Sequence, residues 1–584
     1  MLTRVILRDP DEACWYEYND PVQVVTTSSL ADVATTLKQV EDLVEANGWF
    51  AAGFVCYEAA AGFDAKLVTH LPDNRLPLVC FGLFAQRCRL AVLAPPHASE
   101  VHCAQPDQSP MSWQSIDTPA SYRQRVDAIK TRIAAGETYQ VNLTTQLHST
   151  GQVNYDTFYR IAQAAPYGAF VSAEGFDIVS ASPELFFQSD RHAVVCRPMK
   201  GTAPRGFSTH QDRRQSQWLQ RSAKNRAENL MITDMVRNDL GRVAVPGSVQ
   251  TTALFDVSAY STVWQMTSTV TAQTPLGVTD LFRALFPGAS ITGAPKRASM
   301  AFIQQYESTA RAVYTGAIGM LAPGRVARFN IAIRTAWSDK QNNTSCYGAG
   351  CGIVWDSDAH AEWRELQLKT EVLSTRQQAF RLIETMRGTV DGIYLLAAHL
   401  ARLQASAEYF DFVIDTPAVK AALAKLELNG TVKVRLTLAA DGQFDIETAE
   451  LPQQPAVQPI MLTPAQIEKH QPWLYHKTTC REVYDRASRQ VPADCEALLV
   501  NSEGRVTESA IANIVYQMDG ELFTPPVEDG LLPGVLRSAE VAAGKVTERS
   551  LPVTQVEKVE RWFLVNTLRG WRDACLREQH APHR

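Results

Sequence analysis

Apolar residues recur with the period of an α-helix in several segments of the chain. Over residues 121–136 they share one face, at Tyr122, Val126, Ile129 and Ile133. Ser121 and Gln124 have the spacing of a capping box at the start of a helix, and Gly136 predicts its end. A longer helix is predicted over residues 216–240.

Other segments alternate apolar and polar positions with the period of two that a half-buried strand shows. TYQVNLTTQL (138–147) and RVARFNIAIRTA (325–336) follow this pattern. In FRLIETMRGTVDGIYLL (380–396), two strand-like runs flank Val390-Asp391-Gly392, which predicts a hairpin. Mixed helices and strands of this kind indicate an α+β protein.

Breaks in these patterns suggest how the chain is divided. Pro, Ser and Asp accumulate over 94–119, which predicts a long loop, and LPQQPAVQP (451–459) predicts a linker. A helical period gives way to strand-like runs near residues 374–380. We therefore expect a large α+β unit over residues 1–374 and a smaller unit over 380–584.

Composition excludes several classes of protein. The 584 residues are 45% hydrophobic and 20% charged, with a formal net charge of −6. This composition excludes wholesale disorder and argues against nucleic-acid binding. We see no secretion signal and no apolar run of about 18 residues, so we expect no membrane partner. Scattered Cys residues without a CxxC pair favour a reduced, cytoplasmic protein.

Four segments place charged residues beside Gly or Pro in apolar surroundings: SASPELFF (180–187), CRPMKGTAPR (196–205), AENLMITDMVRNDLG (227–241) and GAGCGIVWDSDAHAEWRELQLK (348–369). On a helix, Glu362, Glu365 and Lys369 fall within an arc of about 60°. Glu228 is a further candidate to face the same site. Several carboxylates at one site favour a hard cation, and Mg²⁺ is the one we expect.

The same spacings have plainer interpretations. Glu365 and Lys369 are four residues apart, and this spacing alone favours a solvated ion pair on a helix. Gly348, Gly350 and Gly352 form either a plain turn or a set of exposed amides that hold a carboxylate. Spacing alone leaves both alternatives open.

Taken together, the four segments resemble the chorismate-utilising enzyme family in order over residues 120–370. FPGASITGAPKRASM (286–300) and FNIAIRT (329–335) add further blocks of that family. The resemblance implies an α/β sandwich of two antiparallel sheets flanked by helices, with the site in the cleft between them. It also implies chorismate as substrate and Mg²⁺ held by Glu228, Glu362 and Glu365.

One residue indicates the branch of that family. Pro198-Met199-Lys200-Gly201-Thr202 carries Lys where anthranilate synthases carry Ala, so the chain resembles the aminodeoxychorismate synthases. The resemblance implies that Lys200 adds at C2 of chorismate while the C4 oxygen departs, after which ammonia adds at C4 and expels Lys200. A lysine is a nucleophile only when neutral, so we expect Lys200 to be desolvated. We assign acid and base catalysis to Glu184.

The remaining substrate contacts implied by the resemblance are side chains and backbone amides around the ring: Arg334, Lys369, Thr292, Gly293, Gly350 and Gln265. Arg334 and Lys369 are expected to meet the enolpyruvyl carboxylate. Gln265 stands where the family often has His, and Gln cannot carry a proton at neutral pH. Cys351 stands where a small residue is common, and we expect its side chain to point away from the site.

The source of ammonia lies outside this sequence. A glutamine amidotransferase would need a nucleophilic Cys in a G-x-C-x-G turn, and Cys56, in GFVCYEA, lacks that frame. We expect Cys56 to be a core residue. A separate glutamine amidotransferase subunit, or else free ammonia, is therefore implied.

The C-terminal part contains a second set of candidate residues. Lys477 follows an apolar-aromatic run, Glu508 leaves a hairpin built on Asn501-Ser502-Glu503-Gly504, and Gly534-Val535-Leu536 opens a helix after Pro533. A lone lysine of this kind is usually an ordinary one. However, a lysine, a carboxylate and a helix N-terminus that holds phosphate are what pyridoxal phosphate (PLP) needs.

This set resembles the fold-type IV PLP enzymes, and among them the aminodeoxychorismate lyases, over most of 380–584. The resemblance implies that Lys477 binds PLP covalently and moves protons, while Glu508 keeps the pyridine nitrogen protonated. The resemblance also implies that Arg402 and the amides of Val535 and Leu536 bind the phosphate. Asn513 is expected to support the site, and Arg435 is a candidate contact to the substrate carboxylate. This unit is also a candidate for homodimer formation.

These expectations combine into one hypothesis, with two rivals. The N-terminal half aminates chorismate at C4, and the C-terminal half eliminates pyruvate to give 4-aminobenzoate, a folate precursor. The first rival makes the C-terminal half an amino-acid aminotransferase, and the second makes it a non-catalytic docking module. The fusion of the two halves favours consecutive steps.

Overall fold

The computed structural model describes the chain except for residues 97–110, 261–262, 374–379, 452, 454 and 578–584. Its contacts divide the chain into two compact units. The first comprises Met1–Pro204 and Ser216–Gln377, and the second comprises Arg205–Gln215 and Gln378–Arg584. Within the described residues, no helix combines the length and the apolar character needed to cross a membrane.

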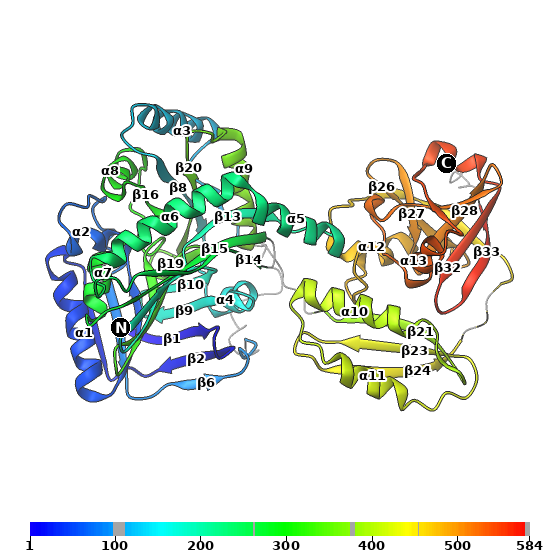
Figure 1. Ribbon diagram of the computed structural model, residues 1–584, viewed down its shortest axis with the longest axis horizontal. Coiled ribbons are helices and arrows are strands. Elements are labelled where there is room, and N and C mark those ends of the chain that lie inside the picture. Colours follow the sequence, from blue (N-terminus) through cyan, green and yellow to red (C-terminus); the bar gives the residue numbers. More distant parts are fainter. Residues whose placement is uncertain (97–110, 261–262, 374–379, 452, 454, 578–584) are drawn as a thin grey trace. The chain divides into compact units, whose positions relative to one another are not determined.

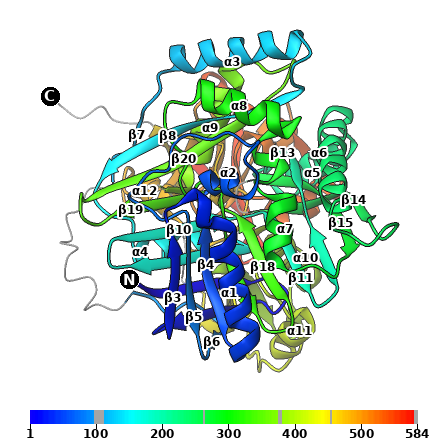
Figure 2. The same ribbon diagram turned by 90° about the vertical axis from the view of Figure 1, so that its left-hand side faces the viewer.

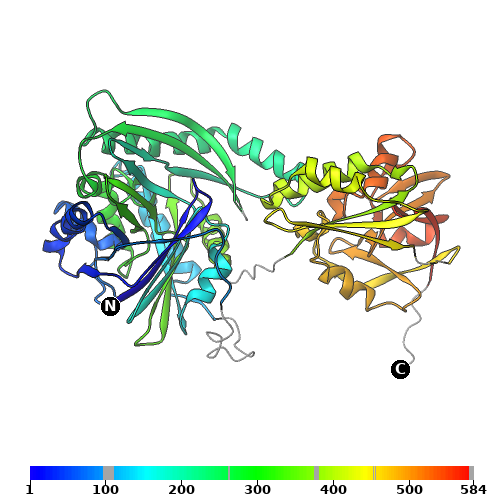
Figure 3. The same ribbon diagram turned by 90° about the horizontal axis from the view of Figure 1, so that it is seen from below.

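The first unit contains two antiparallel sheets. In the first sheet the strands run in the order β16 (Gly293–Ala294), β8 (Gln140–Thr150), β20 (Thr344–Ile353), β19 (Thr335–Asp339), β10 (Phe176–Ser182), β9 (Tyr167–Ala173), β1 (Leu2–Asp9), β2 (Cys14–Asn19) and β6 (Cys88–Leu90), and β7 (Gln114–Ser115) pairs with β8. In the second they run β13 (Met199–Pro204), β15 (Val263–Gln273), β12 (Ala193–Cys196), β11 (Leu185–Asp190), β18 (Val326–Ile331), β17 (Ala317–Ala322), β4 (Phe50–Val55), β5 (Val79–Phe84) and β3 (Gln23–Thr27). β14 (Gln250–Ala259) pairs with β15 in a long hairpin (Figure 3).

Helices flank both sheets (Figure 1). Helix α1 (Val33–Asn47) packs on β3, β4 and β5 of the second sheet (Figure 2), and α7 (Val278–Leu285) packs on α1. On the first sheet, α3 (Pro119–Ala134), α4 (Tyr155–Ala162), α8 (Lys296–Tyr306) and α9 (Ala359–Thr370) cover a second apolar cluster. The largest cluster joins the two sheets through residues such as Val5, Phe54 and Phe329. Burial of this apolar surface is the main source of stability of the sandwich.

Two predicted helices differ from the structure at their boundaries. Helix α3 begins at Pro119, and its capping box is formed by Thr118 and Ser121 instead of Ser121 and Gln124. Proline is well suited to the first helical position because it lacks the N–H that would have no partner there. The single helix predicted over 216–240 is wrong: α5 (Thr209–Arg221) ends before Ser222, whose hydroxyl caps α6 (Ala223–Gly241).

Most predicted strands are confirmed. The segment 138–147 lies largely in β8, and 325–336 forms β18 and enters β19. The hairpin at Val390–Gly392 joins β21 (Leu382–Thr389) to β22 (Gly392–Ile393), which is only two residues long because a helix follows. Most of the loop predicted at 94–119, the break near 374–380 and part of the 451–459 linker lie outside the described residues.

The second unit also contains two sheets. The smaller has the order β22, β21, β23 (Val432–Leu438) and β24 (Phe444–Glu450), and packs against α10 (Leu396–Phe410) and α11 (Thr416–Ala424). The larger has the order β30 (Thr547–Glu548), β29 (Glu521–Thr524), β28 (Asn513–Met518), β32 (Arg561–Asn566), β33 (Gly570–Leu576), β25 (Gln458–Ile467), β26 (Glu496–Asn501), β27 (Arg505–Ser509) and β31 (Leu551–Pro552). Helices α12 (Glu482–Ser488) and α13 (Val535–Ala542) complete the unit.

Candidate active sites

Glu184 lies in the first unit, in the short connection from β10 to β11. Its carboxylate accepts hydrogen bonds from the Ser290 hydroxyl at 2.7 Å and from the Met199 N–H at 3.4 Å. Burial raises the pKa of Glu184 to about 7. A carboxyl group with this pKa is able to give and take protons near neutral pH. A narrow pocket lined by Glu184, Ser290, Pro198 and Gly288 opens beside it.

We expect the activity of the first unit to depend on protonated Glu184. The rate should fall as pH rises above about 7, because the carboxyl group loses its proton there. Glu184→Gln should remove this limb of the profile and lower kcat/KM by about 10²–10⁴-fold. Ser290→Ala removes a donor that stabilises the charged form, so the limb should move to higher pH. The measurement is a pH–rate profile, and an unchanged midpoint in Ser290→Ala would contradict the assignment.

Lys200 extends from β13 toward α6 and β20. Its Nζ lies 3.5 Å from Glu228 Oε2, and the two side chains are each 19% exposed. A Cβ on Gly352 of β20 would lie 2.6 Å from the Lys200 Nζ, so a residue larger than Gly would displace the amine. Asn229, next to Glu228, donates to the Lys200 carbonyl oxygen at 3.0 Å and holds the strand in place. Lys200 is therefore enclosed and lies beside an acidic residue.

Helix α9 brings the other predicted acidic residues to this site. Lys369 Nζ pairs with Glu365 Oε1 at 2.8 Å and donates to the Gly350 carbonyl oxygen at 2.8 Å. The helix ion pair suggested by the spacing therefore exists. Burial raises the pKa of Glu362. Burial also acts to raise the pKa of Glu365, but the charge and hydrogen bond of Lys369, together with the charges of Lys200 and Lys224, lower it overall. The charge of Lys200 acts on both carboxylates. Glu362 and Glu365 thus share one electrostatic environment with Lys200.

Cys351 takes part in this acidic cluster. It faces away from Gly350 and Gly352, because neighbouring residues of a strand point to opposite sides. Nevertheless its Sγ lies within 4.8 Å of carboxylate oxygens of Glu362 and Glu365. We expected this side chain to point away from the site, and this expectation is wrong because the thiol lies near the two carboxylates. Carboxylate oxygens so arranged fit a hard divalent cation.

The remaining predicted substrate contacts differ in whether the protein already provides their side chains with hydrogen-bond partners. Arg334 is largely enclosed beside Tyr347 and Tyr260, and burial lowers its pKa. No hydrogen bond or ion pair holds its guanidinium within the described part of the chain, which leaves it able to bind an anion. Gln265 Oε1 accepts from Thr202, and the Thr292 hydroxyl donates to the Gly288 carbonyl oxygen at 2.9 Å. Both are therefore already engaged in protein hydrogen bonds.

Close backbone packing explains why Gly is needed at position 293. The neighbouring Gln140 is a candidate site residue that the sequence analysis missed. A Cβ on Gly293 would lie 2.0 Å from the Gln140 carbonyl oxygen, so β16 pairs with β8 only because this residue is Gly. The Gln140 side-chain amide is fully buried, and neither of its polar atoms has a hydrogen-bond partner within the described residues. The signal in the sequence was a Gln at an inward position of an apolar strand.

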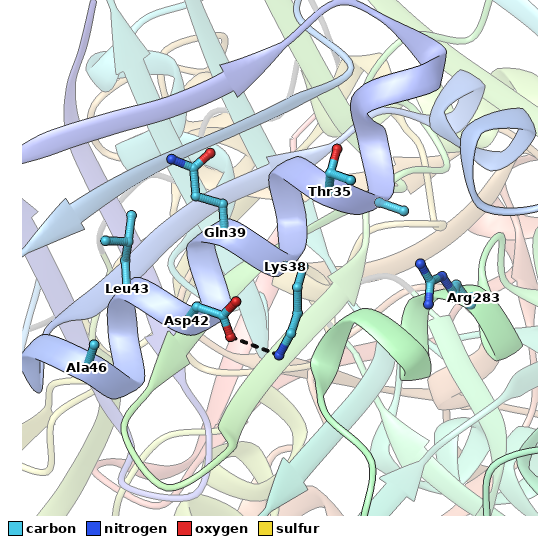
Figure 4. A pocket seen from close by; sticks show the side chains of 8 residues that line it. Thr35, Lys38, Gln39, Asp42, Leu43, Ala46 and Arg283 are labelled. Atoms are coloured by element: carbon cyan, nitrogen blue, oxygen red, sulfur yellow. Dashed lines mark ion pairs between the residues drawn. The ribbon is translucent and has the colours of Figure 1, made fainter.

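A larger surface pocket lies away from these residues. It is formed by α1 and Arg283 of α7, and the ion pair of Lys38 and Asp42 crosses it (Figure 4). None of the predicted site residues lines it, so we attach no chemistry to it.

In the second unit, Lys477 is partly buried, and the charges of two arginines act on it. Burial, and then the charges of Arg402 and Arg481, lower its pKa to about 8. A lysine with this pKa is neutral in a substantial fraction of molecules near neutral pH and is a competent nucleophile. The Lys477 carbonyl oxygen accepts from the Ile383 N–H at 2.8 Å, which fixes the backbone of the lysine against β21.

Glu508 lies near the end of β27 in a dense network of hydrogen bonds. Its carboxylate accepts from the Tyr484 hydroxyl at 2.8 Å, from the Leu532 N–H at 3.1 Å and from the Asn513 side chain at 3.0 Å. Burial raises its pKa to about 7, and the charge of Lys477 acts in the opposite direction. Asn513 also approaches Gly534, where a Cβ would lie 1.9 Å from Asn513 Oδ1.

The residues predicted to bind phosphate lie around the start of α13. Gly534 precedes the helix, so the amides of Val535 and Leu536 lie in its first turn. Arg402 reaches the Pro533 carbonyl oxygen at 3.4 Å and is held by the Glu384 carboxylate at 2.7 and 2.9 Å. Glu384, which also binds His399, was missed because a single buried Glu in a strand gives no pattern.

These residues fit PLP: a partly buried lysine with a lowered pKa, a buried carboxyl group and a helix N-terminus beside an arginine. Arg435 is the exception among the predicted residues. It lies on the face of β23 opposite to the core residues Val434 and Leu436. No hydrogen bond or ion pair joins its side chain to the other predicted site residues within the described chain.

The fold and the two lysines define a protein with two chemically distinct centres. The chorismate binding enzyme family matches residues 3–375, more than half of the chain, and the chain belongs to this family. The amino-transferase class IV family matches residues 381–575. The resemblance to both families and the expected fold, a two-sheet sandwich followed by a fold-type IV domain, are thus confirmed.

Individual proteins agree with this assignment. An aminodeoxychorismate synthase component 1 from Salmonella typhimurium is 42% identical over 44% of this chain and 57% of its own length. An anthranilate synthase component 1 from Haloarcula marismortui is 37% identical over 46% of this chain and 54% of its own length. The chain thus spans little more than half the length of these relatives. The crystal structure of anthranilate synthase component I from Streptococcus pneumoniae, 22% identical, has a similar fold over 64% of this chain and 92% of its own, with a TM-score of 0.53.

Proposed function

We propose that this protein makes 4-aminobenzoate in two steps. The N-terminal half, over residues 1–374, aminates chorismate at C4 to give 4-amino-4-deoxychorismate. The C-terminal half, over 380–584, eliminates pyruvate from that product. The observation that carries the first step is the enclosed Lys200 beside Glu228 and Gly352. The resemblance to the aminodeoxychorismate synthases implies that Lys at this position, in place of Ala, directs amination to C4.

In the first step each residue of the cleft has its own function. The Lys200 amine attacks C2 of chorismate, both conjugated ring double bonds shift, and the C4 hydroxyl departs as water after taking the proton of Glu184. Ammonia then attacks C4, the double bonds shift back, and the bond between C2 and Lys200 breaks. Glu184 accepts a proton from the added ammonia and returns to its starting form. Arg334 and Lys369 bind the enolpyruvyl carboxylate, and the Gly293 and Gly350 amides bind substrate oxygens.

Glu228, Glu362 and Glu365 would hold Mg²⁺ in this cleft. The ion would supply positive charge that offsets the charge of the ring carboxylate. Glu228 has a second function, because its carboxylate lies 3.5 Å from the Lys200 amine and orients it.

We expect Glu228→Gln to raise the Mg²⁺ concentration needed for half-maximal activity by about tenfold or more, since one charged ligand is lost. Asp234→Asn on the same helix, an exposed residue paired with Arg237, is the matched control and should leave the Mg²⁺ dependence unchanged. The measurement is the rate of chorismate consumption against Mg²⁺ concentration. Equal half-maximal concentrations in the wild type and Glu228→Gln would rule out this ligand.

In the second step, PLP bound at Lys477 would supply an electron sink for the carbon that carries the amino group. The Lys477 amine removes the C4 proton, and the ring becomes aromatic as pyruvate leaves. Glu508 holds a proton at the pyridine nitrogen, and its raised pKa makes that proton available near neutral pH. Arg402 with the amides of Val535 and Leu536 would bind the phosphate, and Arg435 would bind the substrate carboxylate.

The proposal includes partners outside this chain. Ammonia would come from a glutamine amidotransferase subunit or from free ammonium. We further propose a cytoplasmic location and a homodimer formed through the C-terminal half. The family match to class IV amino-transferases also supports a second candidate function, in which this half transfers an amino group to a 2-oxo acid.

Product identification decides between these functions. Purified protein is supplied with chorismate, ammonium, Mg²⁺ and PLP, and the products are separated and identified by mass. We expect 4-aminobenzoate and pyruvate in equal amounts. Accumulation of 4-amino-4-deoxychorismate, together with amino transfer to 2-oxoglutarate from an added amino acid, would favour the aminotransferase. Formation of anthranilate would contradict the proposed first step.

A further inference from the structure

A short segment of the N-terminal half of the sequence belongs to the second compact unit. Residues 205–215 follow β13 and form the beginning of α5, yet they group with residues 378–584. The chain therefore leaves the first unit directly after the strand that carries Lys200 and returns to it at Ser216.

Arg205 anchors the segment. Its guanidinium donates to both carboxylate oxygens of Asp212 at 2.8 Å and to the Tyr409 carbonyl oxygen at 2.8 Å. It also lies over the Tyr409 ring, 4.4 Å from the centroid. The side chains of Arg205 and Asp212 are only 8% and 7% exposed, so water screens this forked pair little. The Gly206 N–H completes the turn by donating to Asp212 at 2.9 Å.

The anchored segment packs against the residues that precede Lys477. The Phe207 ring is stacked on Tyr475, with centroids 6.4 Å apart, and the Tyr409 ring lies 4.2 Å from the ring of His476. His476 Nδ1 is hydrogen-bonded to the Ser406 hydroxyl at 2.9 Å. Burial lowers the pKa of His476 to about 4, with the Phe207 backbone and the Asp212 charge acting in the opposite direction. The ring is therefore neutral at pH 7 and is enclosed by the segment.

Lys477 follows His476 directly, so what fixes His476 also fixes the backbone of the lysine. One side of this backbone is held by β21, through the Ile383 N–H. The two residues before Lys477 are held by other contacts: Tyr475 stacks on Phe207 and His476 packs on Tyr409, to which Arg205 is hydrogen-bonded. The low pKa of Lys477 arises chiefly from burial, and burial depends on tight packing of these neighbours.

We propose that Arg205 is a positioning residue for Lys477: by holding residues 205–212 against Tyr409 and His476, it keeps the lysine amine in its buried place. Arg205 acts through these neighbours and is not a catalytic residue. The inference rests on the proposed PLP site at Lys477. It means that the N-terminal half of the sequence contributes part of the second site.

The test compares two Arg→Lys variants of the full-length protein. Arg205→Lys keeps the charge but loses the fork that binds Asp212 and Tyr409. Arg213→Lys is the matched control on the same segment, in an ion pair with Glu408 whose side chains are 65% and 54% exposed. PLP is added to cofactor-free protein over a range of pH, and the rate at which visible absorbance develops is recorded. Borohydride fixation and peptide mapping confirm attachment at Lys477, and Tm is measured in parallel.

The rate should follow the neutral amine, with a midpoint near 8 in the wild type and in Arg213→Lys. In Arg205→Lys the midpoint should rise by about half a unit or more, because water that reaches the amine favours its charged form. Phe207→Leu, which removes the stacked ring but keeps an apolar side chain, should show the same upward shift and replaces Arg205→Lys if that variant does not fold.

Two results would overturn the inference. The first is an equal midpoint in the wild type and in a folded variant. The second is a lower Tm, or a lower fraction of bound PLP, with an unchanged midpoint, because a merely structural role of Arg205 predicts that result. Absence of PLP attachment in the wild type at every pH would overturn the proposed cofactor site itself. Failure of the inference and failure of the proposed function are therefore distinguishable.

Discussion

Lys200→Ala should abolish the amination of chorismate at C4. The amine that attacks C2 is lost, and ammonia has no second displacement by which to reach C4. We expect the rate of 4-amino-4-deoxychorismate formation to fall by about 10³-fold or more, which corresponds to a barrier increase of roughly 4 kcal/mol. Direct attack of ammonia at C2 remains open to this variant, so a trace of anthranilate-like product is the expected by-product. The measurement is product analysis with ammonium and Mg²⁺ in excess.

Lys38→Ala is a suitable control for this experiment. Lys38 lies on α1, is 55% exposed and pairs only with acidic side chains of the surface helix within the described structure. Its replacement should leave the rate of amination within about twofold, since isolated surface ion pairs contribute little. Undiminished amination by Lys200→Ala would remove the covalent mechanism and leave Lys200 with an electrostatic function beside Glu228.

Lys477→Ala should separate the two steps of the pathway. The C-terminal half would lose both the attachment point of PLP and the base that moves the C4 proton. We expect the visible absorbance of bound PLP to vanish and 4-aminobenzoate formation to fall by about 10³-fold or more. 4-Amino-4-deoxychorismate should then accumulate at the wild-type rate, because the first site is untouched. Absorbance spectra and time courses of both products measure these effects.

Lys545→Ala serves as the comparison in the same unit, because Lys545 is 66% exposed and follows the C-terminal end of α13, whereas the proposed phosphate contacts lie at the N-terminal end of that helix. It should retain absorbance and product formation. Three outcomes distinguish the hypotheses for this half. A wild-type protein that binds no PLP would support a docking module. One that binds PLP but transfers amino groups without releasing pyruvate would support an aminotransferase. Retained 4-aminobenzoate formation in Lys477→Ala would contradict both catalytic hypotheses.

Much of the fold could be predicted from local patterns. The period-two strands at 138–147 and 325–336 and the hairpin at Val390–Gly392 were found because alternation and turn residues are local signals. The helix over 216–240 was predicted wrongly because Ser222 lies within a continuous polar stretch. The periodicity of the sequence does not show that this Ser caps a new helix. Helix boundaries depend on such single contacts.

The candidate sites were predictable where several charged residues fell in recognisable segments. Lys200 lies beside Glu228, and its charge acts on Glu362 and Glu365 of α9. Asn513 is hydrogen-bonded to Glu508 and approaches Gly534 at the start of α13. Ser290 and Glu384 were missed, because each acts through buried contacts with residues that are distant in the sequence. Such contacts follow from tertiary packing, which no local spacing encodes.

Because residues 205–215 belong to the second unit, a single cut in the chain cannot separate the two units completely. A gene divided after residue 377 would yield a larger product that carries the Arg205 turn and a smaller one that needs it. We expect the smaller product to acquire full reactivity at Lys477 only when both are made together, as in fragment complementation.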